Sequence, residues 1–213
     1  MHIKKIGHCC LVINTGSVTI MTDPGGFSTA QNDVRGIDIV LVTHEHHDHF
    51  HIDSVKQIIA NNPNVKIITN ATVGALLTAE NIPFECVAQG GENKAHGAHI
   101  EGYGCTHATI YQDMGQTENT GYFIDGKLFY PGDAFTNPNR PIDILALPSA
   151  GPWMKVSDAI TYACMLKPRV AFPVHDAIMS QHFVGFLHGM LEKILSQNSV
   201  TFIGLKEGEE KDF

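Results

Sequence analysis

A short run of histidines and carboxylates is the segment of this sequence best suited to chemistry. It reads Thr43-His44-Glu45-His46-His47-Asp48-His49 and contains the spacing His-x-His-x-Asp-His, directly after an apolar stretch. Imidazole nitrogens and carboxylate oxygens are ligands that zinc accepts in proteins. His44 and His46 can project together toward one metal ion, while Asp48 and His49, farther along the turn, can reach a second. A polar loop that only caps a helix is the alternative interpretation.

The composition of the chain narrows its function classes. The 213 residues include 13 histidines, nearly as many as the 14 lysines and arginines together, and the net charge is −8. Such a charge disfavours nucleic-acid binding through a broad basic surface. The content of 43% hydrophobic and 17% charged residues is typical of a folded globular domain and argues against disorder or a coiled coil. We therefore expect a small-molecule substrate and no nucleic-acid partner.

The cysteines and the absence of long apolar runs bear on the location of the protein. The cysteines are odd in number and form no C-x-x-C pair, so reduced thiols are expected rather than a disulfide framework: Cys9, Cys10, Cys86, Cys105 and Cys164. No segment has the pattern of a signal peptide or the length of a membrane span. The sequence predicts a cytoplasmic protein that does not associate with membranes.

Strands and helices alternate along most of the chain, as in folds that pack helices over sheets. Two β-branched runs, 10–14 and 18–22, predict a hairpin, and Asp125-Gly126 between apolar runs predicts another. Further strands are expected at 37–43, 65–69, 142–147, 170–174 and 200–203, and helices at 52–60, 71–80, 156–166 and 179–195. The charged tail, 206–213, is expected to be solvated and frayed. The pattern predicts an α/β fold with two sheets covered by helices, in one domain spanning residues 1–213.

The His-x-His-x-Asp-His run resembles the hallmark motif of the metallo-β-lactamase superfamily, and the family's other hallmark residues occur in the same order. Asp23 matches the aspartate that supports the metal site from behind its ligands. His107 matches the third ligand of the first metal, Asp133 the carboxylate that bridges both metals, and His175 the last ligand of the second. The resemblance covers nearly the whole chain. It implies an αββα sandwich, in which two mixed β-sheets are flanked by helices.

The resemblance also implies a dinuclear metal centre at one edge between the sheets. Its ligands would be His44, His46, Asp48, His49, His107, Asp133 and His175. Two divalent ions are expected, most readily Zn²⁺, with Mn²⁺ or Fe²⁺ as alternatives. Two cations about 3.5–4 Å apart can hold a hydroxide near neutral pH, which would attack a substrate. Asp48 and Asp133 would then belong to the catalytic machinery.

This chemistry predicts a metal-dependent hydrolase that acts on a small ester, lactone or phosphoester. The sequence leaves two alternatives open: a phosphodiesterase or nuclease of the same fold, and a non-catalytic metal-binding module. Within the superfamily, the chain is most similar to the compact branch that contains ascorbate-6-phosphate lactonase, which leaves a homo-oligomer possible by analogy. Relatives in that branch commonly place an aromatic residue after the histidine matched by His175, whereas this chain has Asp176.

Three further residues are candidates for contact with a substrate. His8, in a Gly-His segment similar to that branch, could bind substrate or donate a proton. Trp153, in a Gly-Pro loop, could cover a substrate, and His182 could approach the pocket from the last helix. Ordinary packing is the alternative for each. Segment 119–122 is expected to belong to strand structure rather than to the site. His96 and His99 have a spacing that could bind a separate metal, although no second ligand pair accompanies them.

Overall fold

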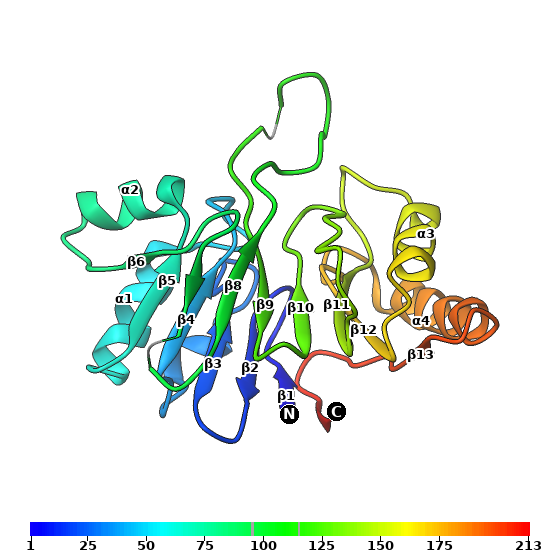
Figure 1. The fold of residues 1–213 in the computed structure, drawn as a ribbon, viewed down its shortest axis with the longest axis horizontal. Coiled ribbons are helices and arrows are strands. Elements are labelled where there is room, and N and C mark those ends of the chain that lie inside the picture. Colours follow the sequence, from blue (N-terminus) through cyan, green and yellow to red (C-terminus); the bar gives the residue numbers. More distant parts are fainter. Residues whose placement is uncertain (95, 115) are drawn as a thin grey trace.

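The computed structural model describes residues 1–94, 96–114 and 116–213, and two β-sheets form its centre (Figure 1). Each sheet has seven strands, and two helices lie against the outer face of each. The layers are therefore helix, sheet, sheet and helix, which confirms the predicted αββα sandwich. No helix in the described part of the chain is long and apolar enough to cross a membrane.

The first sheet comes mainly from the N-terminal half and has the order β14-β1-β2-β3-β4-β5-β6. The antiparallel pairing of β2 with β3 confirms the first predicted hairpin, and β3, β4 and β5 run parallel. The bounds of these elements are β1 (His2–Lys5), β2 (Leu11–Asn14), β3 (Thr19–Thr22), the 3-10 helix Ala30–Asp33, β4 (Ile39–Val42), α1 (Ile52–Asn61), β5 (Lys66–Thr69), α2 (Ala71–Ala79), β6 (Glu85–Cys86) and β14 (Glu210–Asp212).

The second sheet comes from the C-terminal half and has the order β13-β12-β11-β10-β9-β8-β7. Asp125 and Gly126 join β9 to β10, which confirms the second predicted hairpin; both have positive φ, 49° and 61°. The bounds are β7 (Glu92–Asn93), β8 (Ile100–Tyr103), β9 (Gly121–Ile124), β10 (Leu128–Tyr130), β11 (Ile144–Pro148), α3 (Val156–Leu166), β12 (Val170–Val174), α4 (Gln181–Ser196) and β13 (Thr201–Phe202).

Alternating side chains give the sandwich its separate cores. In β4, Ile39 and Leu41 face the space between the sheets, whereas Val40 and Val42 face the cluster that α1 and α2 cover. Successive residues of a strand point to opposite faces of a sheet, so a strand covered on both sides is apolar throughout. All four residues of β4 are buried, as expected from the apolar run at 37–43.

The C-terminal tail differs from the prediction of a frayed end. Residues 210–212 form β14, which pairs antiparallel with β1 at the edge of the first sheet. Lys5 N donates to Glu209 O at 2.9 Å, and Phe213 N donates to Met1 O at 2.9 Å. The side chains of the tail are mostly exposed, which explains its polar sequence. Its backbone forms hydrogen bonds with the backbone groups of β1, which would otherwise be unpaired at the edge of the sheet.

Strand direction brings several loops to the same edge of the sandwich. In the first sheet, β1, β3 and β4 point the same way, since β2 is antiparallel to both β1 and β3. In the second sheet, β8, β10, β11 and β12 share one direction. Residues 104–114, which follow β8, project beyond the end of the sheet (Figure 1). The loops after these strands carry the candidate site.

Candidate metal centre

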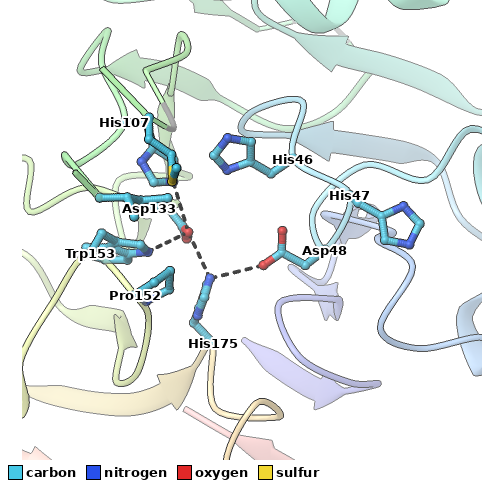
Figure 2. Close-up of a pocket in the computed structure, with 10 residues that line it drawn as sticks. His46, His47, Asp48, His107, Asp133, Pro152, Trp153 and His175 are labelled. Carbon is cyan, nitrogen blue, oxygen red and sulfur yellow. Dashed lines mark hydrogen bonds and ion pairs between the residues drawn. The ribbon is translucent and has the colours of Figure 1, made fainter. Parts of the chain in front are cut away.

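The predicted ligands all follow the carboxyl ends of strands. The run 43–50 comes off β4, and His107, Asp133 and His175 follow β8, β10 and β12. Figure 2 shows His46, Asp48, His107, Asp133 and His175 gathered around one cavity. The structure thus brings together residues that are up to 131 positions apart in the sequence, from His44 to His175.

One group of possible ligands consists of His44, His46 and His107. One nitrogen from each imidazole lies within 4.8 Å of the others. His44 and His107 are buried, and the Nε2 atom of each has no hydrogen-bond partner in the described structure. Burial holds the pKa of His44 well below its ordinary value and also lowers that of His46. The imidazoles of His44 and His46 are therefore neutral near pH 7, which is the form that binds a metal.

A second group surrounds the carboxylates of Asp48 and Asp133. His175 Nε2 lies 3.4 Å from Asp48 Oδ2 and 2.9 Å from Asp133 Oδ2. His49 Nε2 lies 3.1 Å from Asp133 Oδ1. Asp133 also approaches the first group, with Oδ2 3.3 Å from His107 Nε2. Its position between the two groups is the one expected of a bridging carboxylate.

The charges of this second group are strongly coupled. Burial alone would raise the pKa of Asp133, but the imidazoles of His49 and His175 hold it well below its ordinary value. For His175 burial has the opposite sign and lowers the pKa. Asp133 and the neighbouring anionic groups outweigh burial and raise the pKa of His175 to about 10. Without a cation, the protonated histidines therefore neutralise the carboxylates.

The donor set fits divalent cations. Five buried atoms that face this region have no hydrogen-bond partner among the described residues: His44 Nε2, His49 Nε2, His107 Nε2, His175 Nε2 and Asp133 Oδ1. Buried polar atoms are rarely left unpaired in proteins, because each one costs free energy. Nitrogen and carboxylate ligands that converge in this way suit zinc and related ions.

Asp23, at the end of β3, supports the centre from behind. Its Oδ2 atom accepts hydrogen bonds from His49 Nδ1 at 2.7 Å and from the Thr43 hydroxyl at 2.8 Å. Thr43 Oγ1 in turn lies 3.0 Å from His44 Nδ1. When these Nδ1 atoms carry the ring hydrogen and donate hydrogen bonds, the Nε2 atoms of both histidines keep a free lone pair that can bind a metal.

Two supporting residues were not found by sequence reasoning. The hydroxyl of Tyr130 lies 2.7 Å from Asp23 Oδ2. Asn119 Oδ1 accepts from Asp133 N at 3.0 Å, and its Nδ2 donates to Pro131 O at 2.9 Å. The expectation that segment 119–122 is only strand structure is therefore wrong for Asn119, which lies before β9 and fixes the loop of Asp133. Nothing in the local sequence distinguishes these two residues from ordinary strand residues.

The three candidate substrate residues lie in different places. Trp153 is nearly buried, lines the cavity and donates its Nε1 hydrogen to Asp133 Oδ2 at 2.8 Å. His8 is buried beside the centre, with Nε2 3.3 Å from Asp48 Oδ2. His182 is exposed on the first turn of α4 and is not among the residues that line the cavity. The expected approach of His182 to the pocket is therefore absent from this arrangement.

The histidines considered for a separate metal pair with carboxylates instead. His96 Nε2 lies 2.7 Å from Glu85 Oε1, and His99 Nε2 lies 2.9 Å from Glu92 Oε2. Each histidine therefore has its own acidic partner near the surface.

The cavity over the centre has a volume of about 380 Å³. Polar and apolar side chains both line it: His46, His47, Asp48, His107, Ile110, Met114, Asp133, Pro152, Trp153 and His175. Among these described residues there is no lysine or arginine. Lys155, which follows shortly after Trp153 in the sequence, is exposed and lies outside this lining.

Known proteins share this sequence pattern and fold. Protein Rv0786c of Mycobacterium tuberculosis is 30% identical over 215 residues, which cover 95% of this chain and all of that protein. The UPF0173 metal-dependent hydrolase TV0864 of Thermoplasma volcanium is 27% identical, with 82% of this chain and 84% of the relative covered. Among solved structures, the metallo hydrolase Igni18 from Ignicoccus hospitalis has a TM-score of 0.78 and 21% identity, covering 100% of this chain and 98% of that one.

The likeness to Igni18 concerns the fold, and the narrower resemblance to ascorbate-6-phosphate lactonase stays a prediction. The family itself is shown by sequence. A model of the beta-lactamase superfamily domain matches residues 2–175, a range that includes every predicted ligand. This chain belongs to the beta-lactamase superfamily.

Proposed function

We propose a substrate class and a site mechanism for this metal-dependent hydrolase of the metallo-β-lactamase superfamily: hydrolysis of a small uncharged ester or lactone at a two-cation centre. The observation that carries the proposal is the set of imidazole nitrogens and one carboxylate oxygen without hydrogen-bond partners, at a cavity whose described lining contains no lysine or arginine. The name of the relative from Thermoplasma volcanium supports the hydrolase class.

The protein residues divide into two ligand groups joined by one carboxylate. His44, His46 and His107 would hold one cation, and Asp48, His49 and His175 the other, with Asp133 shared. Divalent cations at such a site, with Zn²⁺ expected, activate water for attack and polarise the oxygen of the substrate. The hydrogen bond from Trp153 Nε1 holds Asp133 Oδ2 in place.

His8 acts on this centre through Asp48. Burial opposes protonation, but the neighbouring Cys9 and the hydrogen bond to Asp48 raise the pKa of His8 above its ordinary value. His8 therefore holds a proton on the side of Asp48 and orients that carboxylate. This arrangement supports a positioning role, and proton donation to the leaving group stays a prediction.

The walls of the cavity argue for an uncharged substrate. Ile110, Met114, Pro152 and Trp153 supply apolar surface beside the ligands. A phosphoester carries a charge that enzymes commonly neutralise with arginine or lysine, in addition to any metal. The described lining contains neither residue, whereas the carbonyl of an ester or lactone needs no such partner.

A comparison of substrate classes tests this proposal. The purified chain, loaded with Zn²⁺ or Mn²⁺, is assayed on neutral lactones and aryl esters and on phosphate monoesters and diesters. We expect kcat/KM to be higher for the neutral carbonyl substrates by at least about tenfold. This factor corresponds to the one charge-assisted hydrogen bond that a phosphoester would lack in a cavity without arginine or lysine. Faster cleavage of a phosphodiester or of single-stranded RNA would instead favour the phosphodiesterase or nuclease alternative.

A variant of one ligand tests the role of the centre. His46→Ala removes a ligand that is only half-buried, so the fold is expected to remain intact and hydrolysis to be lost. Far-ultraviolet circular dichroism checks the fold. His99→Ala is the matched control, since His99 pairs with Glu92 outside the cavity lining. Retained turnover by His46→Ala would contradict the proposal, and metal binding without turnover by the wild type would favour a metal-binding module.

A further inference from the structure

A buried cysteine, Cys9, lies beside the metal centre and is not among the residues that line the cavity. One nitrogen from each of His8, His49 and His175 and the Sγ atom of Cys9 all lie within 4.8 Å of one another. The four side chains are at most 2% exposed, and Cys9 itself is 1% exposed. His49 and His175 are the same histidines that surround Asp133 and Asp48.

Several nitrogens of this group have no hydrogen-bond partner among the described residues. His8 Nδ1, His49 Nε2 and both ring nitrogens of His175 are buried without a hydrogen bond in the described structure. The Nε2 atoms of His49 and His175 have ion-pair contacts with Asp133 and Asp48, but His8 Nδ1 and His175 Nδ1 have no such contact among the described residues. A buried imidazole nitrogen without a partner costs free energy, so these atoms point to a ligand that the group shares. A cation bonded to nitrogen and sulfur would meet this need.

Hydrogen bonds from residues of both sheets hold the backbone of Cys9, and with it the thiol, in this position. The carbonyl of Cys9 accepts a hydrogen bond from Thr22 Oγ1 at 3.0 Å and lies 2.9 Å from the Tyr130 hydroxyl. The neighbouring carbonyl of His8 accepts from His175 N at 3.0 Å. The turn between β1 and β2 is thereby tied directly to the loop that carries His175.

The next residue shows that the placement is specific to Cys9. Cys10 is also buried, but it packs with Val40, Val42 and the apolar side chains beneath α1. The two adjacent side chains therefore point to opposite faces of the first sheet. Only Cys9 of this pair joins the imidazoles.

We infer that Cys9 is a sulfur ligand of the cation that His49 and His175 hold. The inference rests on the metal centre proposed above and adds to it a residue that the hallmark motif does not contain. A thiolate is a soft ligand that zinc and cobalt accept readily and that Mn²⁺ disfavours. The sulfur would therefore bias the second position of this centre toward zinc.

Cobalt spectroscopy tests the inference without an activity assay. The protein carries Cys86→Ser and Cys105→Ser, because both of these thiols are exposed and could bind cobalt adventitiously. The metal-free protein is titrated with Co²⁺, and we expect a sulfur-to-cobalt charge-transfer band in the near ultraviolet. Cys9→Ser should abolish this band but keep the visible cobalt bands, whereas Cys10→Ser, the matched control, should keep both.

A measurement on the zinc-loaded protein that carries Cys86→Ser and Cys105→Ser but keeps Cys9 covers the case in which Cys9→Ser fails to fold. X-ray absorption at the zinc edge should detect a sulfur scatterer at about 2.3 Å. Bound cobalt and zinc with neither the band nor the scatterer would overturn the role of Cys9 while leaving the proposed hydrolase centre in place. Failure to bind either metal would overturn both proposals.

Discussion

At the scale of single residues, hydrogen bonds decide which histidine nitrogens are free for metal. His49 Nδ1 faces Asp23, His44 Nδ1 faces Thr43, and His107 Nδ1 faces the carbonyl of Ala108. In each case Nε2 remains for the cavity side. His175 is different, because neither of its nitrogens has a hydrogen-bond partner in the described structure. Its contacts are the ion pairs with Asp48 and Asp133.

These charges predict that cation binding releases protons. Burial lowers the pKa of His175, but Asp133 outweighs burial and raises that pKa to about 10, so His175 is protonated at pH 7 in the metal-free protein. A cation must displace this proton, and its apparent affinity should rise about tenfold per pH unit for each proton released between pH 7 and the raised pKa. Calorimetry of Zn²⁺ binding in buffers of different ionisation enthalpy measures the number of protons.

The control for proton release is His175→Ala, which should release fewer protons on binding the remaining cation. His44 contributes none, because burial holds its pKa well below the ordinary value and it is already neutral. Identical binding heats in all buffers at pH 7 would contradict the assigned charge of His175.

Trp153 makes a second prediction at this scale. Its Nε1 hydrogen bonds to Asp133 Oδ2 at 2.8 Å, on a carboxylate that both ligand groups approach. Trp153→Phe keeps an aromatic ring but removes this donor. We expect zinc affinity to fall about 10- to 100-fold, as for other residues that orient metal ligands. Competition with a chromophoric chelator measures the affinity, and an unchanged value would show that Trp153 only packs against the cavity.

Sequence reasoning could predict the site residues that lie together in one short run, but not those that reach the site only through the tertiary fold. His44, His46, Asp48 and His49 lie in one short run, so their types and spacing alone indicate a shared role. Thr43, Tyr130 and Asn119 act through hydrogen bonds across the fold. Threonine, tyrosine and asparagine are common in strands and loops, and only tertiary structure distinguishes these three from the others of their type.

At the scale of elements, loops after strands must approach one another closely to form the centre. Gly25, just after Asp23, packs directly against the backbone of the motif run. A Cβ atom at Gly25 would lie 1.9 Å from Asp48 O and 2.6 Å from His49 N. The adjacent Gly26 N donates to His47 O at 2.7 Å. The loop after β3 therefore fixes the position of the loop after β4, which carries Asp48 and His49.

Gly25→Ala should consequently disturb both stability and metal binding. The contact is with backbone, so either loop must move, and we expect a loss of about 1–3 kcal/mol in the free energy of unfolding. Asp48 should shift with its carbonyl, which would weaken cation binding at the proposed second position. Urea unfolding and metal counting by elemental analysis measure the two effects.

Gly185→Ala is the matched control for this substitution. Gly185 lies on α4 with nothing within 4 Å of a built Cβ atom, so alanine should stabilise the helix by about 0.5–1 kcal/mol. If Gly25→Ala behaved like Gly185→Ala, the close approach of the two loops would not matter for the centre.

Most elements could be predicted because their signals are local. The hairpin at Asp125-Gly126 and the apolar strand β4 follow from turn chemistry and from burial on both faces. The strand β14 could not be found in this way, because its sequence is charged and its side chains are exposed. It exists through backbone pairing with β1, which depends on where the rest of the chain has placed that edge.

At the scale of the whole molecule, one buried charge network joins the two ends of the chain to the centre. Lys5, the last residue of β1, is 1% exposed and binds Asp176 Oδ1 at 2.6 Å. Its Nζ atom also donates to Pro173 O at 3.0 Å and approaches Leu205 O at 3.4 Å. His188, on α4, lies 3.1 Å from Asp176 Oδ2. Asp176 directly follows His175, so the network fixes the loop of that ligand against the first sheet and α4.

Removing the Lys5 ammonium leaves the buried Asp176 carboxylate with only His188 as a charged or hydrogen-bonding side-chain partner in this network. Burial raises the pKa of Asp176, but His188 and Lys5 outweigh it, and the pKa in the folded protein lies below its ordinary value. This carboxylate therefore contributes stability above its unfolded pKa of about 3.9, which is lost as the pH falls through the folded value. Lys5→Met fills the same space without the charge and should lower stability by about 3–5 kcal/mol at pH 7.

The pH dependence of that loss separates a charge effect from a packing effect. In Lys5→Met, Asp176 keeps His188 but loses the lysine, so it takes up a proton more easily, and the deficit in stability relative to the wild type should shrink between pH 7 and pH 4. Lys4→Met is the control, since the neighbouring Lys4 is half-exposed and its contact with Glu210 is 3.9 Å long. Exposed pairs contribute little to stability, so this variant should unfold in urea almost as the wild type does. Equal losses for the two variants, or a deficit in Lys5→Met that does not change with pH, would show that the lysine stem rather than the buried ion pair holds β1 to the loop of His175.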